Sequence, residues 1–210
     1  MAKQLIIIGA GGHAKVVTDI LIENGEYDIT GYIDCDLSKE YRGIRVLGED
    51  SILPLLLERG ISYAFVAIGD NELREKLQRM CIKAGYQIIN VISRHSVISP
   101  TAIMGTGNVI MDGAVIHAST VIGNGCIINT NASVDHDCII GDYCHIAPGT
   151  AISGFTSVGK KSFLGTGSRV IDKIVVGECV ILGAGGVVVK NTPSNVKMVG
   201  IPARVIKNMK

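Results

Sequence analysis

Histidines, cysteines and carboxylates crowd into one short stretch of the sequence, residues 131–150, which is NASVDHDCIIGDYCHIAPGT. Such side chains can hold a metal ion, form a redox pair or share a proton as an acid/base dyad. The chemistry depends on which of them the fold leaves at its surface. The candidates are Asp135, His136, Asp137, Cys138, Asp142, Cys144 and His145.

The net charge and the lengths of the apolar runs indicate which kinds of partner the protein can bind. The chain has 210 residues and a formal net charge of +1, and its lysines and arginines form no run. Nucleic-acid binding and attachment to a membrane surface normally need such a basic patch, so we expect neither. Every apolar run is shorter than the roughly 20 residues that cross a bilayer. We expect a cytoplasmic protein whose six cysteines are reduced thiols.

The first part of the chain, residues 1–92, alternates apolar strands with helical patterns. QLIII, ITGYID, SYAFVAIG and QIINVIS have the composition of strands, and HAKVVTDILIENG and NELREKLQRMCIKAG have helical spacing. In the second helix the spacing places Leu73, Leu77, Met80 and Ala84 on one face. This order predicts a small α/β domain with a Rossmann-like parallel sheet.

From Ile98 onward an aliphatic side chain recurs at every sixth residue without a slip. A hexapeptide repeat is typical of a parallel β-helix, in which three hexads form one triangular coil and positions three hexads apart stack. Residues 93–210 should therefore form about five coils and a C-terminal tail. The sixteen aliphatic positions are Ile98, Met104, Ile110, Ile116, Ile122, Ile128, Val134, Ile140, Ile146, Ile152, Val158, Leu164, Val170, Val176, Leu182 and Val188.

The hexad phase separates the crowded stretch into core and surface. Cys138 and Cys144 fall on the small inward position of their hexads, where cysteine behaves as a compact apolar residue. We therefore expect neither a metal site nor a redox pair. His136 and His145 are left for chemistry at the surface of the coil.

Several motifs together resemble one enzyme family. GAGGHAK, YID, AIGDN, INTNASVDHDC, CHIAPG and GIPAR occur in that order along the chain. They are similar to the motifs of the NeuD/PglD-type sugar O- and N-acetyltransferases, and the resemblance covers essentially the whole chain. It implies a left-handed β-helix, a homotrimer, and acetyl-CoA as the co-substrate that donates the acyl group.

The resemblance implies that His136 is the general base and that Asp137 orients it. The acceptor must lose a proton as it attacks a thioester, and a neutral imidazole can accept that proton near pH 7. A neighbouring carboxylate can hold the tautomer of the ring. Asp137 stands where bacillosamine enzymes have Glu, so direct contact with His136 is a question for the structure. From spacing alone, His136 is a solvated turn residue.

Three further positions in the β-helix match family residues. Asn129 matches a residue that contacts the acceptor sugar, and His145 matches one near the thioester of acetyl-CoA. Gly154 follows His136 by three hexads and therefore lies one coil above it. Its backbone N–H matches the family's donor to the oxyanion. The structural alternatives are a turn asparagine that stabilises left-handed backbone for Asn129 and a purely structural role for His145.

The N-terminal glycine turn admits two interpretations. Gly9, Gly11 and Ala14 fit the G-x-G-x-x-A pattern of a dinucleotide site, and Asp34 follows at a suitable distance. Amides at a helix N-terminus bind any phosphate, however, and the resemblance implies a nucleotide-sugar pocket with Asp34 near the base. We expect the second. The substrate-binding residues would be Gly11, Gly12, His13, Lys15, Asp34, Gly69 and Asn129.

The tail VKNTPSNVKMVGIPARVIK is similar to the ends of hexapeptide acyltransferases. The resemblance places Gly200, Pro202 and Arg204 beside CoA. Arg204 and Lys190 could meet its phosphates as point charges, although a solvated cationic tail is an equal alternative.

The resemblance, together with the residues that carry it, implies an acetyl-CoA-dependent N-acetyltransferase acting on a nucleotide-linked amino-deoxy sugar, such as an NDP-4-amino-4,6-dideoxyhexose, for cell-surface glycan biosynthesis. Attack should be direct, within a ternary complex, because no residue resembles an activated nucleophile. O-acetylation of a sialic acid is the close alternative. A non-catalytic NDP-sugar or NAD sensor and an NAD-dependent oxidoreductase are more distant ones.

Overall fold

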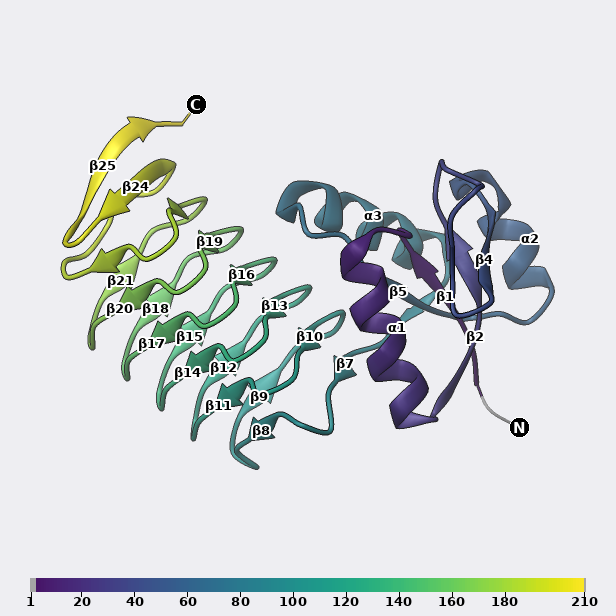
Figure 1. Cartoon of the computed structure of the whole chain (residues 1–210), viewed down its shortest axis with the longest axis horizontal. Coiled ribbons are helices and arrows are strands. Elements are labelled where there is room, and N and C mark those ends of the chain that lie inside the picture. Colours follow the sequence, from purple (N-terminus) through teal and green to yellow (C-terminus); the bar gives the residue numbers. More distant parts are fainter. Residues whose placement is uncertain (1–2, 210) are drawn as a thin grey trace. The chain divides into compact units, whose positions relative to one another are not determined.

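A computed structural model describes residues 3–209 and divides into two compact units, one ending at Val91 and the other beginning at Ile92 (Figure 1). The first unit is an α/β domain, as the sequence predicts. Its sheet has the order β3-β4-β2-β1-β5-β6, and all neighbours are parallel except β3 and β4. The elements are β1 (Lys3–Ile8), α1 (Gly12–Asn24), β2 (Tyr27–Ile33), β3 (Glu40–Tyr41), β4 (Ile44–Gly48), a 3₁₀ turn (Asp50–Ile52), α2 (Leu53–Glu58), β5 (Tyr63–Val66), α3 (Asn71–Ala84) and β6 (Gln87–Ile88).

The hairpin of β3 and β4 is an addition that the strand and helix pattern did not predict. Tyr41 pairs with Ile44, so Arg42 and Gly43 alone form the loop, and both have positive φ, 51° and 77°. Two such residues make a type I′ turn, which matches the twist of the strands it joins. The turn allows β4 to extend the sheet beside β2.

The apolar face of α3 that the spacing identifies is only partly buried. Leu73 is 42% exposed and Ala84 is exposed, while Leu77 and Met80 are only half-buried. Arg74 is fully buried instead, together with Gln78 and Cys81. The Arg74 guanidinium donates to the carbonyls of the loop that precedes α3, and such hydrogen bonds offset the cost of burying its charge. The spacing of apolar residues cannot predict that a buried, hydrogen-bonded arginine fixes which side of a helix faces the core.

The second unit is a parallel β-helix, and every predicted aliphatic position ends a two-residue strand. The strands form three faces. The first face contains β7 (Val91–Ile92), β10 (Val109–Ile110), β13 (Ile127–Ile128), β16 (His145–Ile146), β19 (Phe163–Leu164), β22 (Ile181–Leu182), β24 (Val196–Gly200) and β25 (Ala203–Asn208). The second face contains β8 (Val97–Ile98), β11 (Val115–Ile116), β14 (Ser133–Val134), β17 (Ala151–Ile152), β20 (Arg169–Val170) and β23 (Val187–Val188). The third contains β9 (Ile103–Met104), β12 (Val121–Ile122), β15 (Ile139–Ile140), β18 (Ser157–Val158) and β21 (Val175–Val176).

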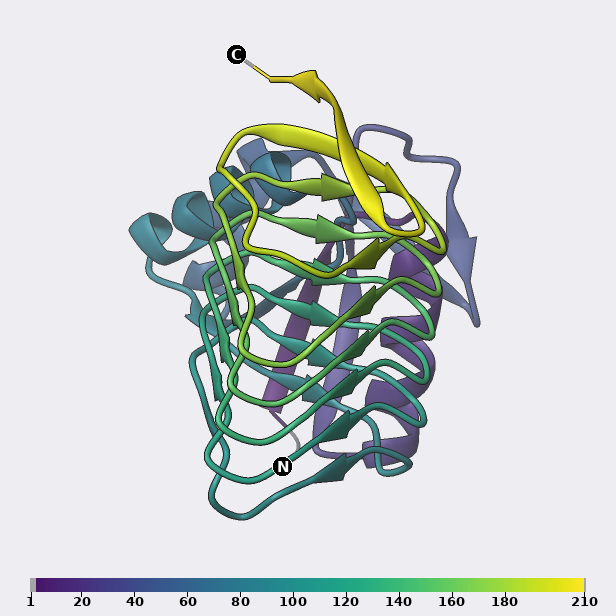
Figure 2. The ribbon, with the colours of Figure 1, turned by 90° about the vertical axis from the view of Figure 1, so that its left-hand side faces the viewer.

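Positions three hexads apart stack in register, as predicted. Ile127, for example, pairs with Val109 in the coil before it and with His145 in the coil after it. Figure 2 shows the coils stacked on one another, with the antiparallel β24–β25 hairpin at the C-terminal end. The second residues of the strands from β10 to β23 are almost completely buried and form one continuous core. No helix within residues 3–209 has the length and apolarity needed to span a bilayer.

The small inward positions form a hydrogen-bonded ladder. A hydroxyl or thiol there donates to a backbone carbonyl of the next coil. These pairs are Thr120 to Asp135 at 2.7 Å, Cys126 to Gly141 at 3.2 Å, Cys138 to Ser153 at 3.3 Å, Cys144 to Gly159 at 3.1 Å, Thr150 to Gly165 at 3.0 Å, Thr156 to Ile171 at 3.1 Å and Ser162 to Gly177 at 2.9 Å. Cys138 and Cys144 therefore lie inside the prism, as the hexad phase predicts.

Candidate active site

His136 and Asp137 form the corner between the second and third faces, in the turn that joins β14 to β15. Asp137 has a left-handed backbone, with φ of 56°. The residues three hexads before and after it, Ser119 and Phe155, have φ of 59° and 57°, so the coil itself imposes this conformation. Aspartate tolerates left-handed backbone better than most residues.

The side chains of this corner form a direct pair. His136 Nδ1 lies 2.9 Å from Asp137 Oδ2, so the shorter carboxylate does reach the ring. Because an ionised carboxylate can only accept, Nδ1 carries the hydrogen, and in the neutral ring Nε2 presents a lone pair. The His136 side chain is 48% exposed, and its backbone N–H donates to Asp135 Oδ1 at 2.8 Å. The geometry suits a general base.

Gly154 lies one coil above, directly against this imidazole. A Cβ at this position would lie 2.7 Å from His136 Cε1 and 2.8 Å from Nε2, so any other residue would displace the ring. Glycine is needed here for its missing side chain rather than for an unusual φ.

The core beneath the corner orients the peptide that precedes Gly154. Cys138 Sγ donates to the Ser153 carbonyl from inside the prism. Burial raises the pKa of the Cys138 thiol, which keeps it protonated for this bond. In a planar trans peptide the N–H points opposite to the carbonyl, so the Gly154 N–H points away from the core. This is the direction that an oxyanion donor requires.

Asn129 and His145 form a second pair, on the first face. Asn129 follows β13 and His145 begins β16, and the Asn129 amide nitrogen lies 3.1 Å from His145 Nε2. Because the amide nitrogen can only donate, Nε2 accepts and the ring is neutral with its hydrogen on Nδ1. His145 also packs edge-on against Phe163, with ring centroids 5.0 Å apart. Within one prism, the second face separates this pair from His136. Asn129 lies where the chain enters that face, and His136 lies where the chain leaves it.

The glycine turn of the first unit leads directly into α1. Gly11 is the N-cap of the helix and Gly12 is its first residue. Burial and, to a smaller extent, the Arg74 charge lower the pKa of His13 to about 4, so this histidine is neutral near pH 7. The Lys15 ammonium lies 5.6 Å from the centre of the Tyr41 ring.

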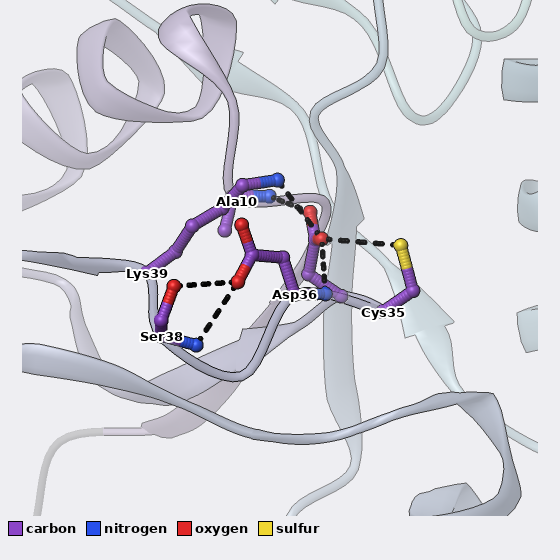
Figure 3. Close-up of polar contacts among 6 residues, drawn as sticks. Ala10, Cys35, Asp36, Ser38 and Lys39 are labelled. Carbon is purple, nitrogen blue, oxygen red and sulfur yellow. Dashed lines mark hydrogen bonds and ion pairs between the residues drawn. The ribbon is translucent and has the colours of Figure 1, made fainter.

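Asp34, at the end of β2, ties the surrounding loops together (Figure 3). Its carboxylate accepts the Ala10 N–H at 2.8 Å, the Asp36 N–H at 3.0 Å and the Lys39 ammonium at 3.0 Å. Burial alone would raise the pKa of Asp34, but the hydrogen bonds from Asp36, Lys39 and Ala10 outweigh it and lower the pKa. Asp34 is therefore ionised and already bound to the protein.

A cavity of about 160 Å³ opens beside Asp34, between the ends of β2 and β4. Its lining residues are Asp34, Cys35, Glu49, Asp50 and Ser51. Gly69 lies after β5, and its carbonyl accepts from Arg74 at 3.0 Å. The predicted nucleotide residues of the first unit thus follow β1, β2 and β5, at the C-terminal edge of the parallel sheet, where ligands of such sheets bind.

The predicted CoA residues of the tail lie on the β24–β25 hairpin. Gly200 ends β24, Pro202 follows a cis peptide bond and Arg204 belongs to β25. A cavity of about 290 Å³ at this end of the prism is lined by Arg204 and Lys190 but not by Gly200 or Pro202. Within residues 3–209, no group of three or more His, Cys, Asp or Glu side chains is placed to hold a metal ion.

Sequence reasoning missed one residue of this corner. Phe155 lies with its ring nearly perpendicular to that of His136, at 86°, with centroids 5.2 Å apart. It stacks on Asp137 because three hexads separate the two positions. The same counting that selected Gly154 could have found it.

Known proteins resemble the chain over part of each unit and over nearly its whole length. Residues 4–81 match the PglD N-terminal domain family, and residues 119–154 match the bacterial transferase hexapeptide (six repeats) family. PerB from Caulobacter crescentus, solved with CoA and GDP-perosamine, is 45% identical with a TM-score of 0.94, and the match covers 97% of each chain. The acetyltransferase domain of PglB from Neisseria gonorrhoeae, solved with acetyl coenzyme A, is 35% identical with a TM-score of 0.91 and covers 98% of this chain and 100% of that one.

Curated relatives match over shorter segments. UDP-N-acetylbacillosamine N-acetyltransferase from Bacillus subtilis is 34% identical over 112 residues, which is 52% of this chain and 51% of the enzyme. An uncharacterized protein of Acanthamoeba polyphaga mimivirus is 34% identical over 111 residues, and the chain spans only 21% of its length.

Proposed function

Because the chain belongs to the hexapeptide-repeat family of PglD-type sugar N-acetyltransferases, we propose that it transfers an acetyl group from acetyl-CoA to the amino group of a nucleotide-linked amino-deoxy sugar. The observation that carries this proposal is the His136–Asp137 pair, which lies against Gly154 at an exposed corner of the prism.

The proposed reaction is a direct transfer. The sugar amine attacks the thioester carbonyl while His136 Nε2 takes one of its protons, and Asp137 stabilises the imidazolium that forms. The Gly154 N–H donates to the oxyanion of the tetrahedral intermediate. The C–S bond then breaks, and the leaving thiolate takes the proton from His136, giving an amide and free CoA. Cys138 is no nucleophile because its protonated thiol is bound inside the core.

The C-terminal edge of the first sheet is the proposed nucleotide site. The amides of Gly11 and Gly12, at the N-terminus of α1, would meet the phosphates. His13, neutral near pH 7, would contribute a hydrogen bond rather than a charge. The Asp34 carboxylate already accepts three protein donors, which supports a role in shaping the pocket and argues against the ribose contact of an NAD site.

The nucleotide is proposed to be GDP. Glu49 and Asp50 line the cavity beside Asp34, and carboxylates pair with the N–H groups of guanine, whereas the carbonyls of uracil would meet them unfavourably. PerB, which was solved with GDP-perosamine, is 45% identical to this chain. A GDP-linked 4-amino-4,6-dideoxyhexose is therefore the first acceptor to test.

The complete site is proposed to form in a homotrimer in the cytoplasm. The outward residues Ile103, Val121, Ile139 and Val175 make a stripe on the third face and are 65%, 39%, 53% and 52% exposed. An exposed apolar stripe of this kind marks a protein interface. His136 borders this face, whereas Asn129 and His145 lie on the first. Packing of two prisms would bring His136 of one copy to Asn129 and His145 of another.

The test is a panel of GDP-, UDP-, dTDP- and CMP-linked sugars, incubated with acetyl-CoA and followed by release of free thiol and by product mass. We expect acetylation of an amine on a GDP-linked sugar. Transfer to hydroxyl acceptors alone would instead identify an O-acetyltransferase. Thermal stabilisation by NADH and by none of the sugar nucleotides would overturn the nucleotide-sugar site, because a ligand of the native state raises its stability.

A further inference from the structure

Phe155 occupies a backbone conformation that suits it poorly. Its φ is 57°, in the left-handed region that bulky residues seldom adopt, and its side chain remains 55% exposed. Asn131 and Asn195, at other corners of the prism, have φ of 55° and 57°, and asparagine is a residue type that accepts this conformation readily. The fold would therefore be satisfied by a polar residue at position 155. A half-exposed ring does not repay the strain by burial in the core.

Phe155 contacts His136, the proposed base. Its ring lies edge-on to the His136 ring, with centroids 5.2 Å apart, and its backbone N–H donates to the His136 carbonyl at 3.1 Å. Gly154, the preceding residue, lies against the same imidazole. The ring is thus held by the Asp137 carboxylate at Nδ1, by Gly154 one coil above it and by Phe155 at its edge.

We propose that Phe155 is a positioning residue for His136. An exposed histidine side chain exchanges between staggered rotamers, and only some of them keep Nδ1 on Asp137 with Nε2 beside the Gly154 N–H. The Phe155 ring removes the space into which the imidazole would otherwise turn. Strain in the backbone is retained here because it places an aromatic ring at the reacting centre. The inference rests on the proposed function, in which His136 is the base.

The test compares Phe155→Asn and Phe155→Tyr with the wild type and with Lys173→Asn. Lys173 has the same corner position one coil later, with φ of 58°, so its replacement relieves similar strain away from the imidazole. Both asparagine variants should raise Tm by a few degrees. Phe155→Asn alone should lower kcat, on the order of tenfold, since a misplacement of about 1 Å can cost up to about 10²-fold. Phe155→Tyr should keep kcat within about twofold, because it retains the ring.

An NMR measurement separates positioning from general damage. The imidazole nitrogens of His136 should show one tautomer, with the hydrogen on Nδ1, in the wild type and in Phe155→Tyr, and averaging of both nitrogens in Phe155→Asn. Unchanged nitrogen shifts together with unchanged kcat would overturn the proposal. Loss of activity in Phe155→Asn that follows dissociation of the oligomer, with the tautomer intact, would also overturn it and assign Phe155 to the interface. The NMR result stands even if no sugar is acetylated, so the two proposals fail separately.

Discussion

At the scale of single residues, the candidate chemistry depends on the hydrogen-bonding state of one imidazole. Sequence reasoning selected His136 and Asp137 from a motif but left their contact open, because contact depends on backbone conformation. The left-handed φ of Asp137 turns its short side chain back toward the residue before it. The spacing of three hexads did predict the position of Gly154, because stacking follows from the repeat alone.

Replacing Asp137 by Asn should lower kcat about tenfold or more while leaving the fold unchanged. Asparagine accepts the left-handed backbone, but its amide group no longer stabilises an imidazolium or fixes the hydrogen on Nδ1. Steady-state kinetics and thermal unfolding check this expectation. Asp135→Asn is the matched control, since its side-chain oxygen can still accept the His136 N–H. Equal activity of the two variants would remove Asp137 from the mechanism.

The His13 imidazole should make stability depend on pH. Its folded pKa of about 4 lies below the ordinary value of 6.5, so the unfolded chain binds a proton that the native state rejects. The contribution of the neutral His13 side chain to the unfolding free energy should therefore be complete above pH 6.5 and should be lost as the pH falls toward 4. Urea unfolding at pH 7 and pH 5 should show a smaller difference in His13→Asn than in the wild type. An identical difference in both proteins would mean that His13 titrates normally.

At the scale of elements, the strands of the β-helix could be predicted because their pattern repeats, whereas parts of the α/β unit could not. Each coil repeats the same aliphatic signal, so errors at single positions do not accumulate, and every predicted position ends a strand of the prism. The α/β unit offers one instance of each element. Its β3–β4 hairpin depends on the left-handed backbone of Arg42 and Gly43. The orientation of α3 depends on the buried Arg74. Neither feature produces a periodic pattern of apolar residues.

The ladder of hydroxyls and thiols should contribute measurably to stability. Thr156 is fully buried and donates to the Ile171 carbonyl at 3.1 Å. Thr156→Val keeps the shape but leaves that carbonyl without its donor, which should cost about 1–3 kcal/mol of unfolding free energy. Thr166→Val, at an exposed position, is the control and should change stability by less than about 0.5 kcal/mol. Equal effects of both substitutions in urea unfolding would show that the ladder contributes nothing.

At the scale of the whole molecule, one chain accounts for only part of the proposed site. The structure brings His136 to Asp137 and Gly154, and Asn129 to His145, but places these groups at different corners. From a single sequence, each of these residues can be identified, but not whether residues of one subunit or of two subunits meet in the site. The exposed stripe of the third face is the feature from which assembly can be argued.

The proposed shared site predicts complementation between two impaired variants. The His136→Ala and His145→Ala variants should each be weakly active, but unfolding and refolding them together should yield some interfaces with both histidines intact. Activity of the refolded mixture should rise several-fold above that of either parent refolded alone. Activity no higher than the mean of the parents would place both histidines in one subunit's site.

The central claim is that His136 is the base of an acetyl transfer to a sugar amine. The most direct measurement is the kcat of the wild type and of His136→Ala with acetyl-CoA and a GDP-linked 4-amino-4,6-dideoxyhexose, with product mass and Tm recorded for both proteins. We predict an N-acetylated product from the wild type and a kcat lower by about 10²–10⁴-fold in the variant, at nearly equal Tm. Full acetyl transfer by His136→Ala would contradict the claim.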